Sequence, residues 1–587
     1  MQRSTSNPNR PPRVVVESVR PQVDCGRYPA KRALGEEVLV EVDVFTDGHD
    51  EVGAELLYRH QSDPDFKAVP MRFHGNDHWS ASFTCEKLGR YQYTVRGWVD
   101  PYLTWQHDLE KRKAAGQDIS VDLLIGKELS KKGIQKHQYE RVLEVIVDPP
   151  RARCSAWYEL FPRSFGGLRG VIEVLPYVEE LGFDVLYLPP IHPIGVTARK
   201  GKNNAVSAQP GEVGSPWAIG AKEGGHKAIE PSLGTLEDFK ALVNEASRRN
   251  IQIALDIAFQ CSPDHPYVKE HPKWFRWRPD GTVQYAENPP KKYQDIYPFE
   301  FDSEDWKGLW EELKSVFEFW IGHGVKIFRV DNPHTKPFEF WEWCISEIKR
   351  SHPEVIFLSE AFTRPRVMHK LAKLGFTQSY TYFTWRNSKS ELTEYFTELT
   401  QDPSREYFRP NCWPNTPDIL HETLQTGGRP AFIVRIVLAA TLAANYGIYG
   451  PAYELLEHLP REPGSEEYLN SEKYEIKKWD LRRPDSLREL ISRLNQIRKE
   501  NPALQENWNL RFHRIDNDHL LAYSKGDMLM VVNLDPRHVQ SGMLDFPGPV
   551  AVHDLLGGGR YNWTGPRNYI ELNPHTLPVH VFKVTPG

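Results

Sequence analysis

Two charged residues that lie two positions apart, Arg329 and Asp331, end the apolar run KIFRVD. On a strand, side chains two positions apart point to the same side. A guanidinium beside a carboxylate lowers the pKa of that carboxylate and keeps it ionised, which a nucleophile or a charge stabiliser requires. The same spacing also suits an Arg–Asp ion pair that serves only the fold, so the pair by itself leaves both interpretations open.

A second acid, Glu360, ends the next apolar run, VIFLSE. One strand–helix unit separates Glu360 from Asp331, so we expect their carboxyl groups on adjacent strands at the same face. Retaining glycosidases hold two carboxyl groups about 5–5.5 Å apart, a separation that neighbouring strand ends supply. Leu358, and not a cation, lies two residues before Glu360, so its pKa is expected to stay high enough for a general acid.

A third acid, Asp418, lies in the segment NTPDIL. Taken alone, it is better explained as the N-cap of a helix that begins in ILHETLQ, because Asp is a favoured capping residue. Three acids that each follow a strand of one repeating pattern are harder to explain as coincidence. Together they indicate glycoside chemistry.

The pattern that positions these acids is a regular alternation of apolar runs and amphipathic helices over residues 151–504. The eight expected strands lie in SAWYELFP, VLYLPP, QIALDIAF, KIFRVD, VIFLSE, QSYTYF, PNCW and NYGIYG. Eight such units predict a (β/α)8 TIM barrel. The connections after the second and third strands, 191–231 and 262–306, are too long for simple loops, and an inserted subdomain is expected at about 261–305. Both leave the carboxyl ends of strands, where barrel active sites lie.

A different pattern flanks the barrel on both sides. Residues 13–150 alternate with period 2 between Asp-Gly and Gly-Asn breaks, which predicts an N-terminal β-sandwich, interrupted by a charged helical insertion at about 102–135. Residues 505–587 alternate again and predict a C-terminal β-sandwich. The first 12 residues are rich in Pro and Asn and are expected to be disordered.

Charge and composition exclude several classes of protein. The 587 residues include 73 Lys and Arg against 79 Asp and Glu, a net charge of −6, so no nucleic-acid or membrane partner is expected. Aromatic residues make up 12% of the chain, which fits large cores or platforms for sugars. Six cysteines without a CxxC pair predict neither a disulfide framework nor a zinc site. The polar first residues do not resemble a signal peptide, so a cytoplasmic location is predicted.

The segments around the three acids resemble the motifs of the α-amylase superfamily, which fall on barrel strands three, four, five and seven. They are most similar to the α-1,4-glucan:maltose-1-phosphate maltosyltransferase family, in LDIAFQCSPDHP, FRVDNPHTKP, FLSEAFTRP, NTPDIL, YELFPRSFGG, LPPIHPIG, ARKGKNN, AENPPKKYQDIYP, QSYTYFTWRN and LNSEKYEIK. The similarity runs from Arg13 through the C-terminal sandwich. It implies retaining transfer of maltosyl from α-maltose-1-phosphate to the non-reducing end of an α-1,4-glucan such as glycogen, with release of phosphate and without a cofactor.

The resemblance also implies roles for individual residues. The nucleophile, the acid/base, the transition-state stabiliser and the partner of the nucleophile would be Asp331, Glu360, Asp418 and Arg329. The maltosyl unit would be held by Lys200, Asn204, Gln260 and Lys473, and the phosphate by Asn288, Lys291, Tyr293 and Asn332. A departing phosphate needs a cation and neutral donors nearby, although Lys291 and its neighbour Lys292 are equally well explained as a solvated loop pair.

Several positions depart from the ordinary amylase pattern. Amylases have an Asn-His pair after the third-strand Asp and a His before the last Asp, where this sequence has Gln260-Cys261 and Pro417. These departures match the maltosyltransferase branch and argue against structural calcium, so no metal is expected. The resembled family builds its homodimer with a large helical bundle, whereas the insertion here is expected to hold about one helix and a loop, which leaves the homodimer an open question.

Two other functions remain as alternatives. An α-glucan hydrolase or a 4-α-glucanotransferase would use the same fold and carboxylates with a glucan as donor, and would need no phosphate. A glucan-binding protein with an inactive barrel would use its aromatic residues as platforms, but it would need no trio of acids. Release of phosphate from maltose-1-phosphate in the presence of glycogen distinguishes these functions.

Overall fold

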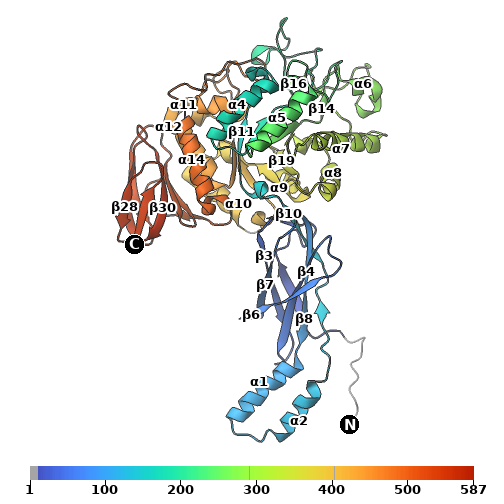
Figure 1. Cartoon of the computed structure of the whole chain (residues 1–587), viewed down its shortest axis with the longest axis vertical. Coiled ribbons are helices and arrows are strands. Elements are labelled where there is room, and N and C mark those ends of the chain that lie inside the picture. The colour runs from blue at the N-terminus through green and yellow to red at the C-terminus, as the bar shows by residue number, and fades with distance from the viewer. Residues whose placement is uncertain (1–10, 290, 402) are drawn as a thin grey trace. The chain divides into compact units, whose positions relative to one another are not determined.

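The computed structural model describes residues 11–289, 291–401 and 403–587. Most of the tail that was predicted to be disordered, residues 1–12, therefore lies outside the described residues. The chain forms two compact units that meet in sequence at Pro149 and Pro150. Figure 1 labels the elements of both units, which are described in turn.

The N-terminal unit is built on two β-sheets, as predicted. One sheet has the order β1-β3-β7-β6 and the other β2-β10-β8-β4-β5, with β9 paired to β8. Along β3 every second residue is buried, from Val38 to Val44, because side chains alternate between the two faces of a strand. The strands are β1 (Val15–Arg20), β2 (Ala30–Ala33), β3 (Glu37–Phe45), β4 (Val52–His60), β5 (Lys67–Pro70), β6 (Arg72–Gly75), β7 (His78–Thr84), β8 (Gly89–Val99), β9 (His137–Gln138) and β10 (Leu143–Asp148).

The helical insertion of this unit is larger than predicted. It holds two helices, α1 (Pro101–Ala114) and α2 (Ser120–Leu129), that form a hairpin beyond the end of β8 (Figure 1). A left-handed glycine, Gly116, ends the first helix, and the Trp105 indole donates to the Asp122 carbonyl at 2.6 Å. The expectation of about one helix was wrong because apolar residues recur only weakly at helical spacing in this charged segment.

The second unit contains a closed barrel of eight parallel strands, which confirms the predicted fold class. Its core cluster includes Trp157, Tyr187, Tyr380 and Trp413. The strands are β11 (Ser155–Glu159), β12 (Val185–Leu188), β13 (Gln252–Ile257), β18 (Ile327–Asp331), β19 (Ile356–Glu360), β20 (Gln378–Tyr380), β21 (Pro410–Cys412) and β22 (Asn445–Tyr449). Each falls inside one of the eight apolar runs.

The helices of this unit include one that is buried on every face. In α12 (Gly428–Leu442), all residues from Ala431 to Leu442 are buried, because β22 and α14 pack on it from the barrel, and β25 and β30 of the C-terminal sheet also contact it. The other helices are α3 (Pro150–Arg153), α4 (Leu168–Glu180), α5 (Leu236–Arg248), α7 (Trp306–Gly322), α8 (Phe338–Ser351), α9 (Pro365–Leu374), α10 (Lys389–Thr400), α11 (Glu422–Thr426), α13 (Gly450–Glu454) and α14 (Arg488–Glu500).

Two long connections leave the carboxyl ends of β12 and β13. The first reaches α5 without a regular strand or α-helix among its residues. The described residues of the second form a small α-helix and four short strands. These are β14 (Gln260–Cys261), α6 (Pro266–Glu270), β15 (Ala286–Asn288), β16 (Lys291–Tyr293) and β17 (Tyr297–Pro298). The boundaries of the predicted subdomain at 261–305 stay a prediction.

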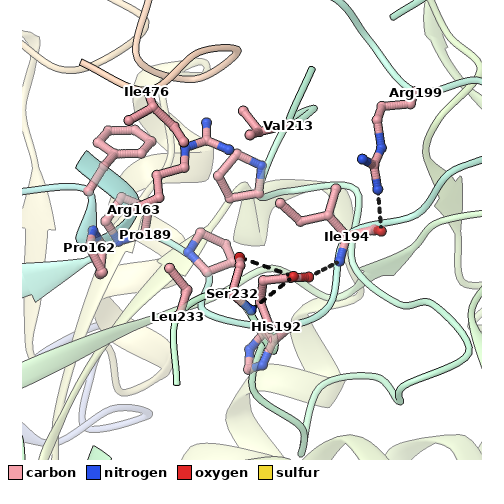
Figure 2. Close-up of a pocket in the computed structure, with 14 residues that line it drawn as sticks. Pro162, Arg163, Pro189, His192, Ile194, Arg199, Val213, Ser232, Leu233 and Ile476 are labelled. Atoms are coloured by element: carbon pink, nitrogen blue, oxygen red, sulfur yellow. Dashed lines mark hydrogen bonds between the residues drawn. The ribbon is translucent and has the colours of Figure 1, made fainter. Parts of the chain in front are cut away.

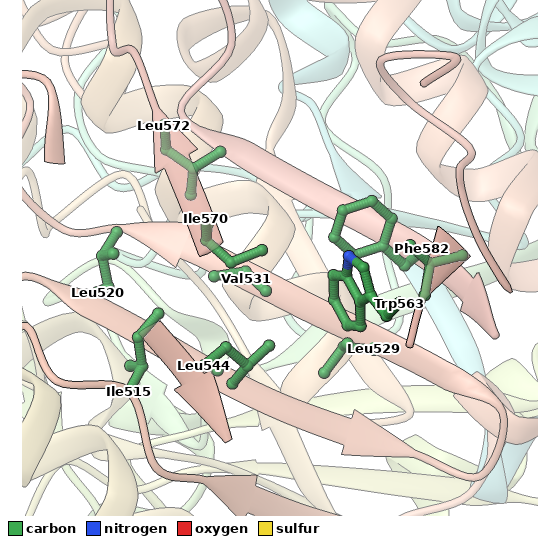
Figure 3. Packing of buried hydrophobic residues seen from close by; sticks show 11 residues of the cluster. Ile515, Leu520, Leu529, Val531, Leu544, Trp563, Ile570, Leu572 and Phe582 are labelled. Carbon is green, nitrogen blue, oxygen red and sulfur yellow. The ribbon is translucent and has the colours of Figure 1, made fainter. Parts of the chain in front are cut away.

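The C-terminal strands form a six-stranded sheet, β23-β24-β25-β30-β27-β28, and a two-stranded sheet, β26-β29. Figure 3 shows their shared core, in which Leu529 and Val531 face Ile570 and Leu572, with Trp563 and Phe582 at one end. The strands are β23 (Leu510–His513), β24 (Leu520–Lys525), β25 (Met528–Asn533), β26 (Gln540–Asp545), β27 (Val550–Asp554), β28 (Arg560–Trp563), β29 (Arg567–Leu572) and β30 (Val579–Pro586).

None of the helices in the described part of the chain has the length and apolar character that a membrane span requires.

Candidate active site

The ends of β18 and β19 bring two carboxylates together at the mouth of the barrel. The two strands are parallel and pair in a register that sets Asp331 directly opposite Glu360. Neighbouring strands lie about 4.8 Å apart, so this register gives the close spacing of carboxyl groups that a retaining glycosidase uses. Both side chains line a cleft of about 1050 Å³.

The guanidinium of Arg329 is shared among three acids. Its Nη1 donates to Asp331 Oδ1 and to Asp256 Oδ2, both at 2.9 Å, and its Nη2 lies 3.4 Å from Glu360 Oε1. Asp256, a buried residue near the carboxyl end of β13, also accepts the Tyr187 hydroxyl at 2.5 Å. A cation so closely surrounded stabilises ionised carboxylates beside it.

The Glu360 carboxyl is suited to carry a proton. Burial raises its pKa most strongly, the Arg329 charge lowers it and the Asp331 charge raises it, which together leave the pKa at about 8. The high pKa agrees with the expectation from sequence, but one reason for it was wrong. Glu360 does have a cationic neighbour, because Arg329 reaches across from the adjacent strand, and burial outweighs it.

Asp418 does not cap a helix, so the alternative that local sequence favoured is wrong. The helix that follows, α11, is capped by His421, whose ring accepts the Thr423 N–H. Asp418 instead lines the cleft and forms an ion pair with Lys473, whose ammonium also lies 4.9 Å from the centroid of the Trp217 ring. Burial lowers the pKa of Lys473, but the charge and hydrogen bond of Asp418, together with Tyr474 and Glu467, raise that pKa above its ordinary value.

The other sequence-predicted residues gather on the walls of the same cleft. Its lining includes Lys200, Asn204, Gln260, Tyr293 and Asn332. The Gln260 side chain donates to the Trp217 carbonyl at 3.1 Å. This hydrogen bond fixes the side-chain amide of Gln260 at the wall of the cleft. The side chains of Asn288 and Lys291 lie outside the described residues; their backbones pair across the β15–β16 hairpin that carries Tyr293.

Comparison with known proteins finds relatives over nearly the whole chain. Family models described as "Alpha-1,4-glucan:maltose-1-phosphate maltosyltransferase, domain N/S", "Alpha amylase, catalytic domain" and "GLGE, C-terminal" match residues 12–159, 152–337 and 512–584. An α-1,4-glucan:maltose-1-phosphate maltosyltransferase of Chlorobaculum tepidum is 51% identical, over 97% of this chain and 96% of the relative. One from Methylacidiphilum infernorum is 49% identical, over 98% and 96%.

The chain belongs to the α-1,4-glucan:maltose-1-phosphate maltosyltransferase family. Among solved structures, an α-amylase from Lactobacillus plantarum matches with a TM-score of 0.58 and 19% identity, over 74% of this chain and 99% of the amylase. At that identity the likeness concerns the barrel fold alone.

Three site residues of this family member were not proposed from its sequence: Asp256, which is buried against Arg329, and Trp217 and Lys336, which line the cleft. Asp256 is hidden inside the apolar run QIALDIAF, where its signal would have been a carboxylate on the strand next to Arg329. Trp217 and Lys336 lie in segments where apolar and polar residues do not alternate regularly, so no sequence pattern predicted that they line the cleft. Among the described residues, no group of three His, Cys, Asp or Glu side chains is arranged to hold a metal ion.

A second, smaller cavity lies where Arg163 connects two loops of the maltosyltransferase cleft. It measures about 180 Å³ (Figure 2), and its wall includes the rings of Pro162, Pro189, Pro190 and Pro216. Arg163, in this wall, donates to the Gly214 carbonyl at 2.9 Å and the Glu472 carbonyl at 2.6 Å. Arg163 therefore ties the connection that carries Lys200 to the segment that carries Lys473.

Proposed function

We propose that this chain transfers maltosyl from α-maltose-1-phosphate to the non-reducing end of an α-1,4-glucan and releases inorganic phosphate. The observation that carries the proposal is the register of Asp331 against Glu360 over a cleft whose lining includes the cations Lys200, Arg276, Lys336 and Lys473. The names of relatives that are about half identical over nearly the whole chain support the same donor and acceptor.

In the first half-reaction, Asp331 would attack the anomeric carbon as the nucleophile. The bond from that carbon to the phosphate oxygen breaks, a bond to the Asp331 carboxylate forms, and Glu360 gives its proton to the departing phosphate. Arg329 donates to Asp331 Oδ1 at 2.9 Å and holds that carboxylate in place. Asp418, with its partner Lys473, would stabilise positive charge on the sugar ring in the transition state.

In the second half-reaction, the acceptor 4-hydroxyl would attack the maltosyl-enzyme. Glu360, now ionised, takes the hydroxyl proton, and the ester to Asp331 breaks. Two inversions at the anomeric carbon give net retention. Glu360 returns to its protonated form, so each cycle consumes one donor and releases one phosphate without a cofactor.

The cleft offers polar groups suited to both parts of the donor. Lys200, Asn204, Gln260 and Lys473 would hold the maltosyl unit through hydrogen bonds to its hydroxyls. Asn332 would donate to the phosphate, and so would Asn288, Lys291 and Tyr293 of the β15–β16 hairpin. A cation with several neutral donors stabilises the charge that develops on a leaving phosphate.

One incubation tests the proposal against its rivals. The enzyme is mixed with α-maltose-1-phosphate and maltohexaose, and both phosphate and the product ladder are measured. We expect phosphate release and products that lengthen by two glucose units at a time. A ladder without phosphate release would identify a 4-α-glucanotransferase, and shorter products alone would identify a hydrolase.

We also propose that the α1–α2 hairpin pairs with a second copy of this chain. Val121 and Leu124 of α2 are each 66% exposed, and Leu123 and Ile125 are exposed as well. Contiguous apolar surface of this kind is uncommon on monomers and marks interaction sites. The family's dimer, expected from sequence resemblance, is the occupant that this surface suits best. The predicted cytoplasmic location stays a prediction.

A further inference from the structure

Lys336 is a buried cation in the cleft that the reaction as described above does not use. The residue is 8% exposed and lines the cleft. Its Nζ donates to the Asn332 carbonyl at 3.2 Å and lies 3.5 Å from the Asp331 carbonyl. None of the ion pairs within 4.0 Å among the described residues includes Lys336. A buried ammonium held by carbonyls alone is unfavourable for the fold, so its presence at this place needs another reason.

The residue that Lys336 holds has an unusual backbone. Asn332 adopts the left-handed conformation, with φ 43° and ψ 51°. A residue other than glycine stays in this region only when its surroundings fix it there. The Asn332 carbonyl accepts three donors: the Thr335 N–H at 3.2 Å, the Thr335 hydroxyl at 2.8 Å and the Lys336 ammonium.

The left-handed turn aims two donors of Asn332 at the two catalytic carboxylates. Its backbone N–H donates to Glu360 Oε2 at 3.2 Å, and its side-chain amide donates to Asp331 Oδ2 at 3.4 Å. If the peptide relaxed to a right-handed conformation, the direction of its N–H would change and Glu360 would lose this donor. The hydrogen bonds that Asn332 donates to both carboxylates therefore depend on the groups that hold the Asn332 carbonyl.

We propose that Lys336 is a positioning residue for maltosyl transfer: by holding the Asn332 carbonyl, it keeps the turn that presents Asn332 to Glu360 and Asp331. The inference rests on the proposed function, since it takes these two acids as the reacting pair. The charge of Lys336 also acts on them directly. Burial lowers the pKa of Lys336, and the charges of Asp331, Glu360 and Asp256 raise it. Lys336 therefore interacts electrostatically with all three acids.

The test compares Lys336→Met with a matched buried lysine outside the site. Lys525 is wholly buried in the C-terminal sheet, and its Nζ is also held by a carbonyl, that of Leu504. Lys336→Met should lower kcat about 10²-fold, the usual loss when one preorganised donor is removed. KM for α-maltose-1-phosphate should change less than about threefold, because the lost interaction acts mainly in the transition state. Lys525→Met should leave kcat near the wild-type value.

A pH profile separates positioning from a purely structural role. The charged and titratable groups around Glu360 are Arg329, Asp331, Asp256, Asp418, His334, Lys336 and Tyr380. Removal of one positive charge should raise the pKa of Glu360 and move the alkaline limb of kcat/KM upward by about one pH unit. Lys336→Arg, which keeps the charge and a donor, should restore the wild-type limb.

A second variant keeps the test decisive if Lys336→Met folds poorly. Glycine adopts the left-handed conformation without strain, so in an Asn332→Gly background the further change Lys336→Met should cost much less activity than in the Asn332 background. Lys336→Arg, which keeps the charge and a donor, should cost little in either background. Equal losses from Lys336→Met in both backgrounds, or wild-type kcat with an unmoved alkaline limb in Lys336→Met, would overturn the proposal. Failure of wild-type enzyme to release phosphate would instead overturn the proposed function.

Discussion

At the scale of single residues, one guanidinium controls the chemistry of three acids. Arg329 contacts Asp256, Asp331 and Glu360 at 2.9, 2.9 and 3.4 Å. Because Arg remains protonated at any working pH, it keeps a fixed positive charge between the proposed nucleophile and the proposed acid. That charge faces both carboxyl groups, which lie side by side on adjacent strands.

The Asp331→Ala change removes the proposed nucleophile. Turnover should fall by about 10⁴-fold or more, as for other enzymes that lose a nucleophilic residue. The fold should survive, because Arg329 keeps Asp256 and Glu360 as partners. Phosphate release and the thermal midpoint are measured together. Retention of a tenth of wild-type turnover would show that another group is the nucleophile.

The Glu360→Gln change should affect the two half-reactions unequally. Departure of phosphate depends on a proton less than attack by the acceptor hydroxyl depends on a base, which is worth about 10²–10⁴-fold. A maltosyl adduct on Asp331 should therefore accumulate and appear in the intact mass. The pKa of Glu360 is raised to about 8, so wild-type kcat/KM should fall as the pH rises through 8, when the acid loses its proton. This alkaline limb should be absent from Glu360→Gln, and its persistence would contradict the assignment.

Much of the residue-level site followed from strand patterns, and the rest did not for physical reasons. Arg329, Asp331 and Glu360 end strands whose apolar runs are plain in the sequence, so their meeting could be predicted. Asp418 looked like a helix cap because local sequence does not show that His421 takes that role. Lys336 lies after a short turn, and its contact with Asn332 depends on a left-handed backbone that no periodicity reports.

At the scale of elements, the β15–β16 hairpin is the part of the cleft wall to which the proposed function assigns the most specific role, the binding of phosphate. If Lys291 binds phosphate, Lys291→Ala should weaken donor use by about 1.5–3 kcal/mol, the value of a hydrogen bond to a charged group. Exchange between maltohexaose molecules needs no phosphate and should hardly change. The quantity to measure is the ratio of phosphate-dependent transfer to glucan exchange.

Lys292 provides the matched control, since it is the next residue of the same strand and is exposed. Lys292→Ala should leave the ratio at its wild-type value, because exposed charges contribute little. If Lys291→Ala behaves like Lys292→Ala, the pair is a solvated part of the hairpin and the phosphate site lies elsewhere.

Elements with strong periods were predicted well, and the shortest ones were not predictable. The eight barrel strands are apolar runs between amphipathic helices, and each was found where the runs lie. The strands β14 to β17 have two or three residues each, too few to show an alternation. Long-range pairing forms them, so their sequence carries no local signal.

At the scale of the whole molecule, the exposed face of α2 predicts an assembly. The double change Val121→Glu and Leu124→Glu places charges on two residues that are each 66% exposed, so the monomer should fold normally. A dimer that buries this face should dissociate, since burying unpaired charges is strongly unfavourable. Mass in solution is measured by light scattering at several concentrations. A wild-type protein that is already monomeric throughout would rule out the proposed pairing.

The second prediction at this scale concerns a chain that ends after residue 504. It would lose β25 and β30, which pack on α12, and would expose several of its aliphatic side chains to water. Each such side chain contributes about 1.5–3 kcal/mol when buried. We expect the shortened chain to be insoluble even though the barrel strands and the proposed catalytic acids are all present. A soluble, folded product with a cooperative thermal transition would contradict this.

The burial of α12 on every face also bears on how such enzymes can change by recombination. A helix with one apolar stripe can be covered by many different partners, so domains joined through it are readily exchanged. Here Thr441 of α12 bonds to the Tyr523 hydroxyl of β24 at 2.7 Å, and the apolar residues around it match one particular sheet. The barrel and the C-terminal sheet must therefore be inherited as a pair, and a hybrid that takes each from a different lineage would need compensating changes along α12 before it could fold.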